Sequence, residues 1–227
     1  MPTKKEKEFE EWKNKIRLKQ LFPQWAEEIK KHYRLILVSL ILLSVATGLD
    51  YVAGNYVTKV GSAESSDLIL SYIPAINLNI LFVYLFLIIV SLIFIYPLIF
   101  NVSKLHLAIG HFSLLIMVRS IFMSLTHLKT PATAIAVKFP DLLSNLVFQN
   151  DLFFSGHTAI PLIGFFLFKE SKIRWFFLAS SIILGATSLL MHRHYSIDVL
   201  AAFFIAYGTF KIGKRLFKKM ENINECD

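Results

Sequence analysis

The segment HRHYSIDVL carries two titratable side chains at a spacing suited to catalysis. His194 and Asp198 are four residues apart, so on a helix they share one face. A carboxylate at that position can accept the Nδ1–H of the imidazole, which fixes the tautomer and leaves Nε2 free as a nucleophile or a base. Because such a pair is more often a structural hydrogen bond, the catalytic interpretation depends on which other polar residues lie nearby.

The segment DLFFSGHTAIP, residues 151–161, places a second histidine among apolar residues. His157 can supply the proton that a departing alcohol needs. The main-chain N–H groups that follow Ser155 and Gly156 open a predicted helix, and a helix N-terminus is a natural site for an anion. Arg119, in VRSIFMSLTHL, adds a planar guanidinium suited to a phosphate. Together these groups supply what phosphoryl transfer without a metal requires.

A metal site is a weaker interpretation of the same residues. His192 and His194 form an H-x-H pair, but no third Cys, Glu or Asp ligand stands at a metal-like spacing. We therefore expect neither a metal nor another cofactor.

The composition predicts that these residues are held by helices that cross a membrane. The chain has 227 residues, of which 55% are hydrophobic, with a mean hydropathy of +0.56, whereas a soluble domain is about 45–50% apolar. The apolar residues gather in six blocks that approach the roughly 20 helical residues needed to cross a bilayer. These blocks cover residues 35–51, 80–100, 105–125, 152–168, 175–191 and 196–213. Because none alternates as a membrane β-strand does, we predict an all-α integral membrane protein, a six-transmembrane-helix bundle.

The distribution of positive charge predicts the orientation of this bundle. The formal net charge is +8, and 19 of the 24 lysines and arginines lie before the first block, from Lys211 to the end of the chain, or in the loops that join blocks two to three and four to five. By the positive-inside rule, both termini then face the cytoplasm, and His157, His194, Asp198 and Arg119 gather on the extracytoplasmic side. Ionisable residues inside a membrane are costly and are candidates for function. The same clustering at span ends argues against nucleic-acid binding.

Residues 1–33 mix Lys and Glu with large apolar side chains. Phe9, Trp12 and Ile16 follow helical spacing, which predicts a basic amphipathic helix lying in the membrane interface. A solvated coil or a packing arm fits the composition equally well. Pro23 is expected to start a second short helix in this segment.

The remainder is assigned to one six-span catalytic membrane domain, residues 34–215, and a cytoplasmic tail, residues 216–227. The longest loops, 52–78 and 128–150, lie on the predicted extracytoplasmic side. The second loop holds an apolar patch, which fits a lid or a lipid access ramp, or else plain loop packing. The patch consists of Leu142, Leu143, Leu146, Val147 and Phe148.

Three segments together resemble the signature of a known family. DLFFSGHT followed by HYSIDV is similar to the signature pair of sphingomyelin synthases and their bacterial relatives, within the type-2 phosphatidic acid phosphatase superfamily. RSIFMSLTHL resembles the arginine-bearing third-span motif of that family. The resemblance covers about residues 115–210, and the six-span layout agrees with it.

This resemblance implies a role for each polar residue. His194 would be a nucleophile that forms a phosphohistidine, Asp198 would orient it, and His157 would act as an acid and then as a base. The family also implies an extracytoplasmic active site, which the charge distribution predicts independently. Arg119, Ser155 and Gly156 are expected to bind the substrate phosphate, with Asp151, Thr158 and Tyr195 as supporting residues.

Two departures from the family pattern bear on the substrate. The broad phosphatase branch carries basic residues where this chain has Phe112 and Ser188. A phosphate monoester carries close to two negative charges near neutral pH, because its second pKa is about 6, whereas a phosphodiester carries one. The missing cations therefore favour a diester donor, and with it a headgroup transferase over a monoester phosphatase.

We predict a membrane enzyme that moves a phospho-headgroup from a phospholipid donor to a lipid alcohol of the diacylglycerol or ceramide class. The first alternative is a lipid phosphate phosphatase, in which water replaces the lipid acceptor. The second is a transporter or lipid-binding membrane protein without enzymatic activity. An inverted repeat with interrupted helices would have supported that second alternative, and the sequence contains none.

Overall fold

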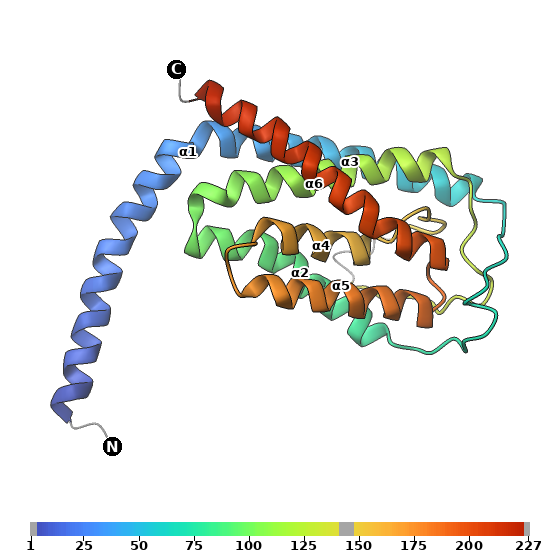
Figure 1. Cartoon of the computed structure of the whole chain (residues 1–227), viewed down its shortest axis with the longest axis horizontal. Coiled ribbons are helices and arrows are strands. Elements are labelled where there is room, and N and C mark those ends of the chain that lie inside the picture. The colour runs from blue at the N-terminus through green and yellow to red at the C-terminus, as the bar shows by residue number, and fades with distance from the viewer. Residues whose placement is uncertain (1–3, 141–147, 225–227) are drawn as a thin grey trace.

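The computed structural model describes residues 4–140 and 148–224, and most of these residues lie in helices (Figure 1). Within these ranges there are six α-helices and one short 3-10 helix, η1. They are α1 (Lys4–Val60), α2 (Asn79–Phe100), η1 (Val102–Lys104), α3 (Leu105–Leu125), α4 (Gly156–Leu167), α5 (Ile173–Leu190) and α6 (Ser196–Asn224). The only β-structure in the described ranges is an isolated bridge between Ala63 and Leu128. The prediction of an all-α protein is confirmed.

Five of the helices are long and apolar enough to cross a membrane, judged by length and composition. They are α1, from Trp25 onward, α2, α3, α5 and α6, and they are consistent with an integral multi-pass protein. Helix α4 has 12 residues, which corresponds to about 18 Å at 1.5 Å per residue. That is shorter than the roughly 30 Å of a bilayer core, so a sixth full-length span is not confirmed.

The shortness of α4 has a local cause in residues 152–155, which sequence analysis placed inside a span. Phe153 has a φ of 97°, which a helix cannot accommodate, and the Ser155 N–H donates to the carbonyl of Asp198 (3.1 Å). Leu152 and Phe154 are buried by other parts of the protein. An apolar run that is covered by protein has the same hydropathy as one that faces lipid, so the two could not be told apart from the sequence.

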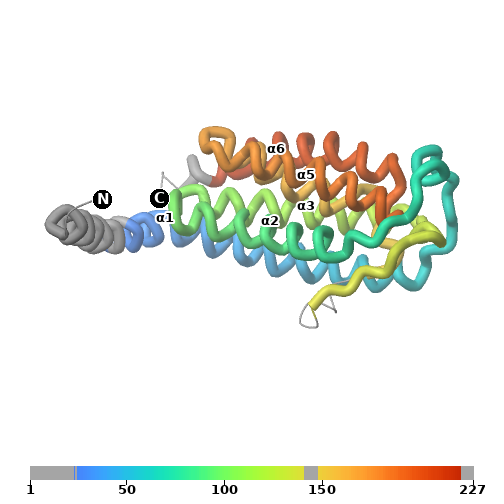
Figure 2. The backbone as a smooth tube through the Cα atoms, turned by 90° about the horizontal axis from the view of Figure 1, so that it is seen from below, coloured from blue at the N-terminus to red at the C-terminus, as the bar shows by residue number. Residues whose placement is uncertain are grey.

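Helix α4 lies in the interior of the bundle and packs on α5, α6, α3 and α2. Eight of its residues are buried. Gly164 allows the ring of Phe177, on α5, to approach the α4 backbone closely, because a Cβ at that position would collide with the ring. The two views agree that the other helices run side by side around this centre (Figures 1 and 2).

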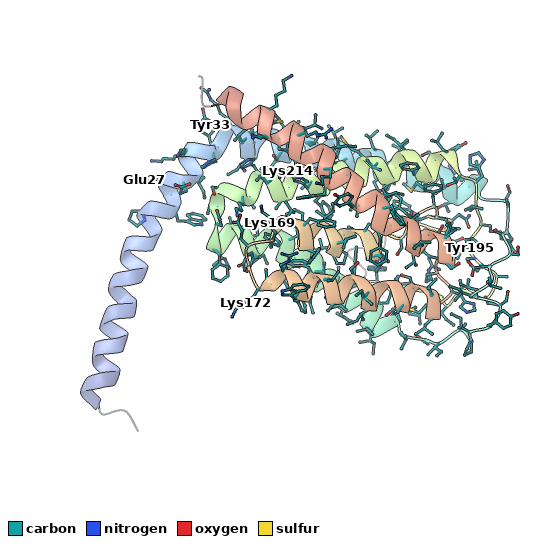
Figure 3. The ribbon with its side chains drawn as sticks, in the orientation of Figure 1. Glu27, Tyr33, Lys169, Lys172, Tyr195 and Lys214 are labelled. Carbon is teal, nitrogen blue, oxygen red and sulfur yellow. The ribbon has the colours of Figure 1, made fainter. Side chains whose placement is uncertain are left out.

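Helix α1 is longer than expected and corrects two sequence predictions. It continues without interruption through Pro23, so no second short helix begins there, because a proline removes one hydrogen bond and the helix can resume beyond it. It also extends to Val60, so the first long loop begins at residue 61 instead of 52. The part that carries Glu27 points away from the bundle, and α1 turns toward it near Tyr33 (Figure 3).

The amphipathic character predicted for residues 1–33 stays a prediction. Residues 4–22 are helical, but the side chains of Phe9, Trp12 and Ile16 lie outside the described residues. The division into three parts is likewise untested, although α6 runs continuously through most of residues 216–227 and ends at Asn224.

The loops between α1 and α2, α3 and α4, and α5 and α6 meet at one end of the bundle, which we call the loop end (Figure 1). Main-chain hydrogen bonds join them: Lys129 N–H to Ala63 O (2.8 Å), Ile76 N–H to Leu190 O (2.7 Å) and Ile135 N–H to Met191 O (2.9 Å). Of the predicted apolar patch, Leu142, Leu143, Leu146 and Val147 lie outside the described residues. Phe148 is buried, and it packs edge-on against Tyr51 of α1 (6.2 Å between ring centroids).

Candidate active site

The predicted pair of His194 and Asp198 is formed at the start of α6. His194 Nδ1 lies 3.3 Å from Asp198 Oδ2, and the Asp198 side chain is only 1% exposed. The same Oδ2 accepts the main-chain N–H of Tyr195 (3.1 Å). The carboxylate is therefore held in place by the turn that carries the histidine, and Nδ1 is the ring nitrogen committed to it. Nε2 is left for other chemistry.

The first turn of α6 is held by Asp67, in the loop between α1 and α2. Asp67 Oδ2 accepts the N–H (2.6 Å) and the hydroxyl (2.8 Å) of Ser196, the first residue of the helix. Partial burial alone would raise the pKa of Asp67, but hydrogen bonds from Leu70, Ser196 and Ile69 outweigh it and hold that pKa below its usual value. A carboxylate there also matches the positive end of the helix dipole. Asp67 thus fixes the base from which His194 projects.

Ser155, just before α4, ties the second histidine segment to the first. Its N–H donates to Asp198 O (3.1 Å), and its hydroxyl lies 3.4 Å from that of Ser188 on α5. The Ser155 side chain therefore faces α5. Among the described residues, the N–H groups of Gly156 and His157 have no hydrogen-bond acceptor, as is usual in the first turn of a helix, where they can meet an anion.

His157 is held by stacked aromatic rings. Its imidazole is stacked between Phe82 and Phe86 of α2, with ring centroids 3.8 Å and 4.0 Å away and interplanar angles of 15° and 28°. Its Nε2 is buried and has no hydrogen-bond partner among the described residues. The ring plane is thus fixed while Nε2 stays available for proton transfer.

Arg119, on α3, lies between two carboxylates. Its Nη1 is 2.6 Å from Asp50 Oδ1 of α1, and its Nη2 forms an ion pair with Asp151, just before α4. The Arg119 side chain is 14% exposed. Arg119 also borders Gly156, since a Cβ on that glycine would lie 3.4 Å from Nε. This cluster joins α1, α3 and the segment that leads into α4.

A cavity of about 300 Å³ brings most of these groups together. Its wall between α2, α3 and α4 is apolar over about two helical turns, from Phe82 to Val90 on α2. Its polar groups lie toward the loop end. The lining residues are Thr47, Asp50, Phe82, Phe86, Leu87, Val90, Phe112, Ile116, Arg119, Thr130, Val137, Phe139, Phe148, Asp151, Gly156, His157, Ile160, Arg193 and His194. Such a shape suits a ligand with a polar group and an apolar chain.

Five of the nine predicted site residues line this cavity: His194, His157, Arg119, Gly156 and Asp151. Asp198 supports His194 from behind. The other three, Ser155, Thr158 and Tyr195, lie off the cavity lining.

Thr158 and Tyr195 have contacts that fit a structural role. Thr158 Oγ1 lies against Gly185 of α5, where an added Cβ would be 3.1 Å away. Tyr195 donates its hydroxyl to Lys129 O (2.9 Å) and accepts the Ser65 N–H (3.1 Å), which joins two loops at the loop end (Figure 3).

Two charged residues of the cavity were not identified from the sequence, Asp50 and Arg193. Asp50 could have been noticed, because it is an acidic residue at the end of an otherwise apolar block. Arg193 lies in the loop between two spans, where a basic residue is common and does not by itself indicate a functional site. For neither residue does the spacing in the sequence indicate where it lies relative to His194.

His192 does not join His194 in a shared site. Its Nδ1 lies 2.6 Å from Thr133 Oγ1 and its Nε2 lies 3.2 Å from Ile73 O, so both ring nitrogens are engaged with loops. Among the described residues, no group of three or more His, Cys, Asp or Glu side chains is arranged to hold a metal.

One comparison with known proteins gives a match, at the level of a superfamily. Residues 150–215, which contain His157, His194 and Asp198, match a family model described as PAP2 superfamily C-terminal. This match supports the type-2 phosphatidic acid phosphatase superfamily, whose members are phosphatases or phosphotransferases acting in lipid phosphate chemistry. No curated protein and no solved structure gave a significant match.

Proposed function

We propose that this protein is a membrane lipid phospho-headgroup transferase, similar in its chemistry to sphingomyelin synthases, that acts through a phosphohistidine. The superfamily match supports lipid phosphate chemistry in general. The observation that carries the finer proposal is the single cavity that joins His194, backed by Asp198, with His157 and an apolar wall. A histidine that lines the cavity and is oriented by a buried carboxylate supports an enzyme over a transporter or a lipid-binding protein.

In the first half of the proposed reaction, His194 Nε2 attacks the phosphorus of a phospholipid. A P–N bond forms and the P–O bond to the diacylglycerol breaks. Protonated His157 gives its proton to the departing oxygen, so diacylglycerol leaves as a neutral alcohol. Asp198 stabilises the positive charge that His194 gains, and the free N–H groups at the start of α4 can bind a phosphate oxygen.

In the second half, a lipid alcohol takes the place of diacylglycerol. His157 accepts the hydroxyl proton as the alcohol oxygen attacks phosphorus, and the P–N bond breaks to restore His194. The apolar wall from Phe82 to Val90 supports a lipid acceptor, because an acyl chain gains free energy when it is buried against apolar side chains, whereas water finds no hydrogen-bonding groups there.

The charges around the cavity support a diester donor. Two arginines, Arg119 and Arg193, line the cavity, together with two carboxylates, Asp50 and Asp151. Phe112 also lines the cavity, at the position where the broad phosphatase branch carries a basic residue, so this position adds no positive charge. A lining in which carboxylates offset the arginines suits a singly charged phosphodiester better than a doubly charged monoester.

The decisive experiment incubates the purified protein with labelled phospholipids, with and without diacylglycerol or ceramide, and identifies the products. We expect the headgroup to move to the lipid alcohol even when water competes. His194→Ala should abolish turnover, while His127→Ala, which alters an exposed histidine paired with Tyr56, should not. Rapid hydrolysis of phosphatidic acid with diesters left intact would identify a phosphatase instead. Lipid binding without any product would refute an enzymatic role.

We also propose that both termini are cytoplasmic and that the loop end is extracytoplasmic, as the positive charges favour. Tyr195 marks the loop end, and Lys172 lies at the opposite end (Figure 3). After Cys226 is replaced by serine, Ser62→Cys should react with an impermeant thiol reagent in intact cells. Lys172→Cys should react only after lysis. The reverse pattern would refute this orientation.

A further inference from the structure

The two arginines of the cavity differ in their electrostatic surroundings. Arg119 is bound by Asp50 and Asp151, so its positive charge is more than balanced by two carboxylates. A phosphate that approached this guanidinium would compete with both for its N–H groups and would be repelled by their charge. Arg119 is therefore poorly placed to bind an anionic substrate directly.

Arg193 has no such partners. It is half-buried, lines the same cavity, and makes no ion pair or side-chain hydrogen bond with any described residue. Its backbone is fixed, since its N–H donates to Ser188 O (2.9 Å). Burial lowers the pKa of the Arg193 guanidinium from its usual value. A partly desolvated cation without a counter-charge is unfavourable, and an anion that entered the cavity would relieve that cost.

We propose that Arg193 binds the phosphate group of the substrate, and that Arg119 is a positioning residue. Arg193 directly precedes His194 in the chain, and both residues line the same cavity. A planar guanidinium can donate two parallel hydrogen bonds to the non-bridging oxygens of a phosphodiester. This inference rests on the proposed function and adds a specificity-determining residue to it.

The second part of the proposal follows from what Arg119 connects. Its ion pairs join α1, through Asp50, to α3 and to Asp151, five residues before the start of α4 at Gly156. In this role Arg119 sets the position of the α4 N-terminus, and with it that of His157. Its removal would leave Asp50 and Asp151 as unpaired, largely buried carboxylates, which is strongly destabilising.

The test measures binding without turnover. In the inactive His194→Gln background, the dissociation constant of dihexanoylphosphatidylcholine is measured in maltoside micelles, with dihexanoylglycerol as the ligand that lacks a phosphate. Adding Arg193→Gln should weaken phospholipid binding by about 10- to 100-fold and leave dihexanoylglycerol binding unchanged. Arg193→Lys should recover part of the loss. The matched control is Arg174→Gln, whose side chain lies over Phe165 and Trp175, and it should change neither affinity.

The role of Arg119 is tested by stability and by kinetics. Arg119→Lys, which keeps the charge but cannot bridge both carboxylates in the same way, should lower Tm and kcat while the KM for phospholipid stays nearly constant. Arg193→Gln should show the opposite pattern, with a raised KM and an unchanged or raised Tm. If Arg193→Gln binds dihexanoylphosphatidylcholine as tightly as its parent, the inference is wrong.

The two proposals fail in distinguishable ways. Transfer activity that is insensitive to Arg193→Gln would overturn this inference and leave the transferase intact. A wild-type protein that neither binds nor converts a phospholipid would overturn the proposed function, and the role of Arg193 with it.

Discussion

The two histidines of the cavity are held by opposite kinds of surroundings. His194 is bound through Nδ1 to the buried carboxylate of Asp198, whereas His157 lies between the rings of Phe82 and Phe86 with no hydrogen-bond partner at Nε2 among the described residues. A carboxylate stabilises positive charge on an imidazole and selects its tautomer. Aromatic rings fix the plane and leave the nitrogens free to exchange a proton. This difference matches a nucleophile on one side of the cavity and an acid–base group on the other.

Apart from loss of the nucleophile His194 itself, the largest effect should come from removing the Asp198 carboxylate without changing its shape. Asp198→Asn would present an amide to His194 Nδ1, and an amide N–H there favours the tautomer with the proton on Nε2. We expect kcat to fall by about 10⁴-fold, because Nε2 would no longer be a nucleophile. Rapid-quench detection of phosphohistidine should show that its formation is lost. Near-normal phosphohistidine formation in a folded Asp198→Asn protein would contradict the role given to this pair.

His157→Ala should have a smaller effect, because it removes a proton carrier and leaves the nucleophile in place. We expect a loss of about 10²–10⁴-fold in kcat. With a donor that has a better leaving group, such as a p-nitrophenyl phosphodiester, kcat should fall far less, since p-nitrophenolate departs without a proton. An equal loss with both donors would show that His157 acts by holding the structure of the cavity instead of by proton transfer.

Sequence spacing predicted the parts of the site that depend on one helix at a time. His194 and Asp198 could be paired because they are four residues apart, and His157 could be placed at a helix start because it follows Ser-Gly. The partners supplied by other helices could not be found in this way. Asp50 meets Arg119 from 69 residues away, and only the packing of α1 on α3 brings them together.

The fold was predictable to the same extent. Hydropathy identified α2, α3 and α5 to within a few residues, because each is a continuous apolar helix. It also found the start of α6, but this helix continues to Asn224, eleven residues beyond the predicted end of its apolar block. Hydropathy failed at the start of α4, where Leu152 and Phe154 are buried in an irregular segment. The expectation that a helix begins at Pro23 was also wrong, because α1 continues through this residue. At α4 tertiary packing decided the outcome, and no local sequence pattern indicates it.

A milder change should loosen His157 without removing it. Phe86→Leu would take away one of the two stacked rings and leave Phe82 in place. Since an aromatic contact contributes about 0.5–1.5 kcal/mol, we expect kcat to fall by roughly 2- to 10-fold. The matched control is Phe100→Leu, an exposed residue on the same helix that packs on Tyr96 and should leave kcat unchanged. If Phe86→Leu equals His157→Ala in effect, the ring has a role beyond orientation.

The smallest effect should come from Asp67, which supports the side of the cavity that carries His194. Asp67→Asn keeps the shape of the side chain but weakens the hydrogen bonds to Ser196. The free energy of unfolding should fall by about 1 kcal/mol, and Tm by about 2–4 °C. We expect kcat to fall by less than about threefold. The pKa of Asp67 is lowered in the folded protein, so its contribution is complete above the unfolded value of 3.8 and is lost as the pH falls through the folded pKa. The Tm difference from wild type should therefore be constant at neutral pH and disappear in strong acid.

The matched control is Glu64→Gln, which alters an exposed carboxylate in the same loop paired with Lys129, and it should leave Tm nearly unchanged. An equal shift in both variants would show that Asp67 does not anchor α6 specifically.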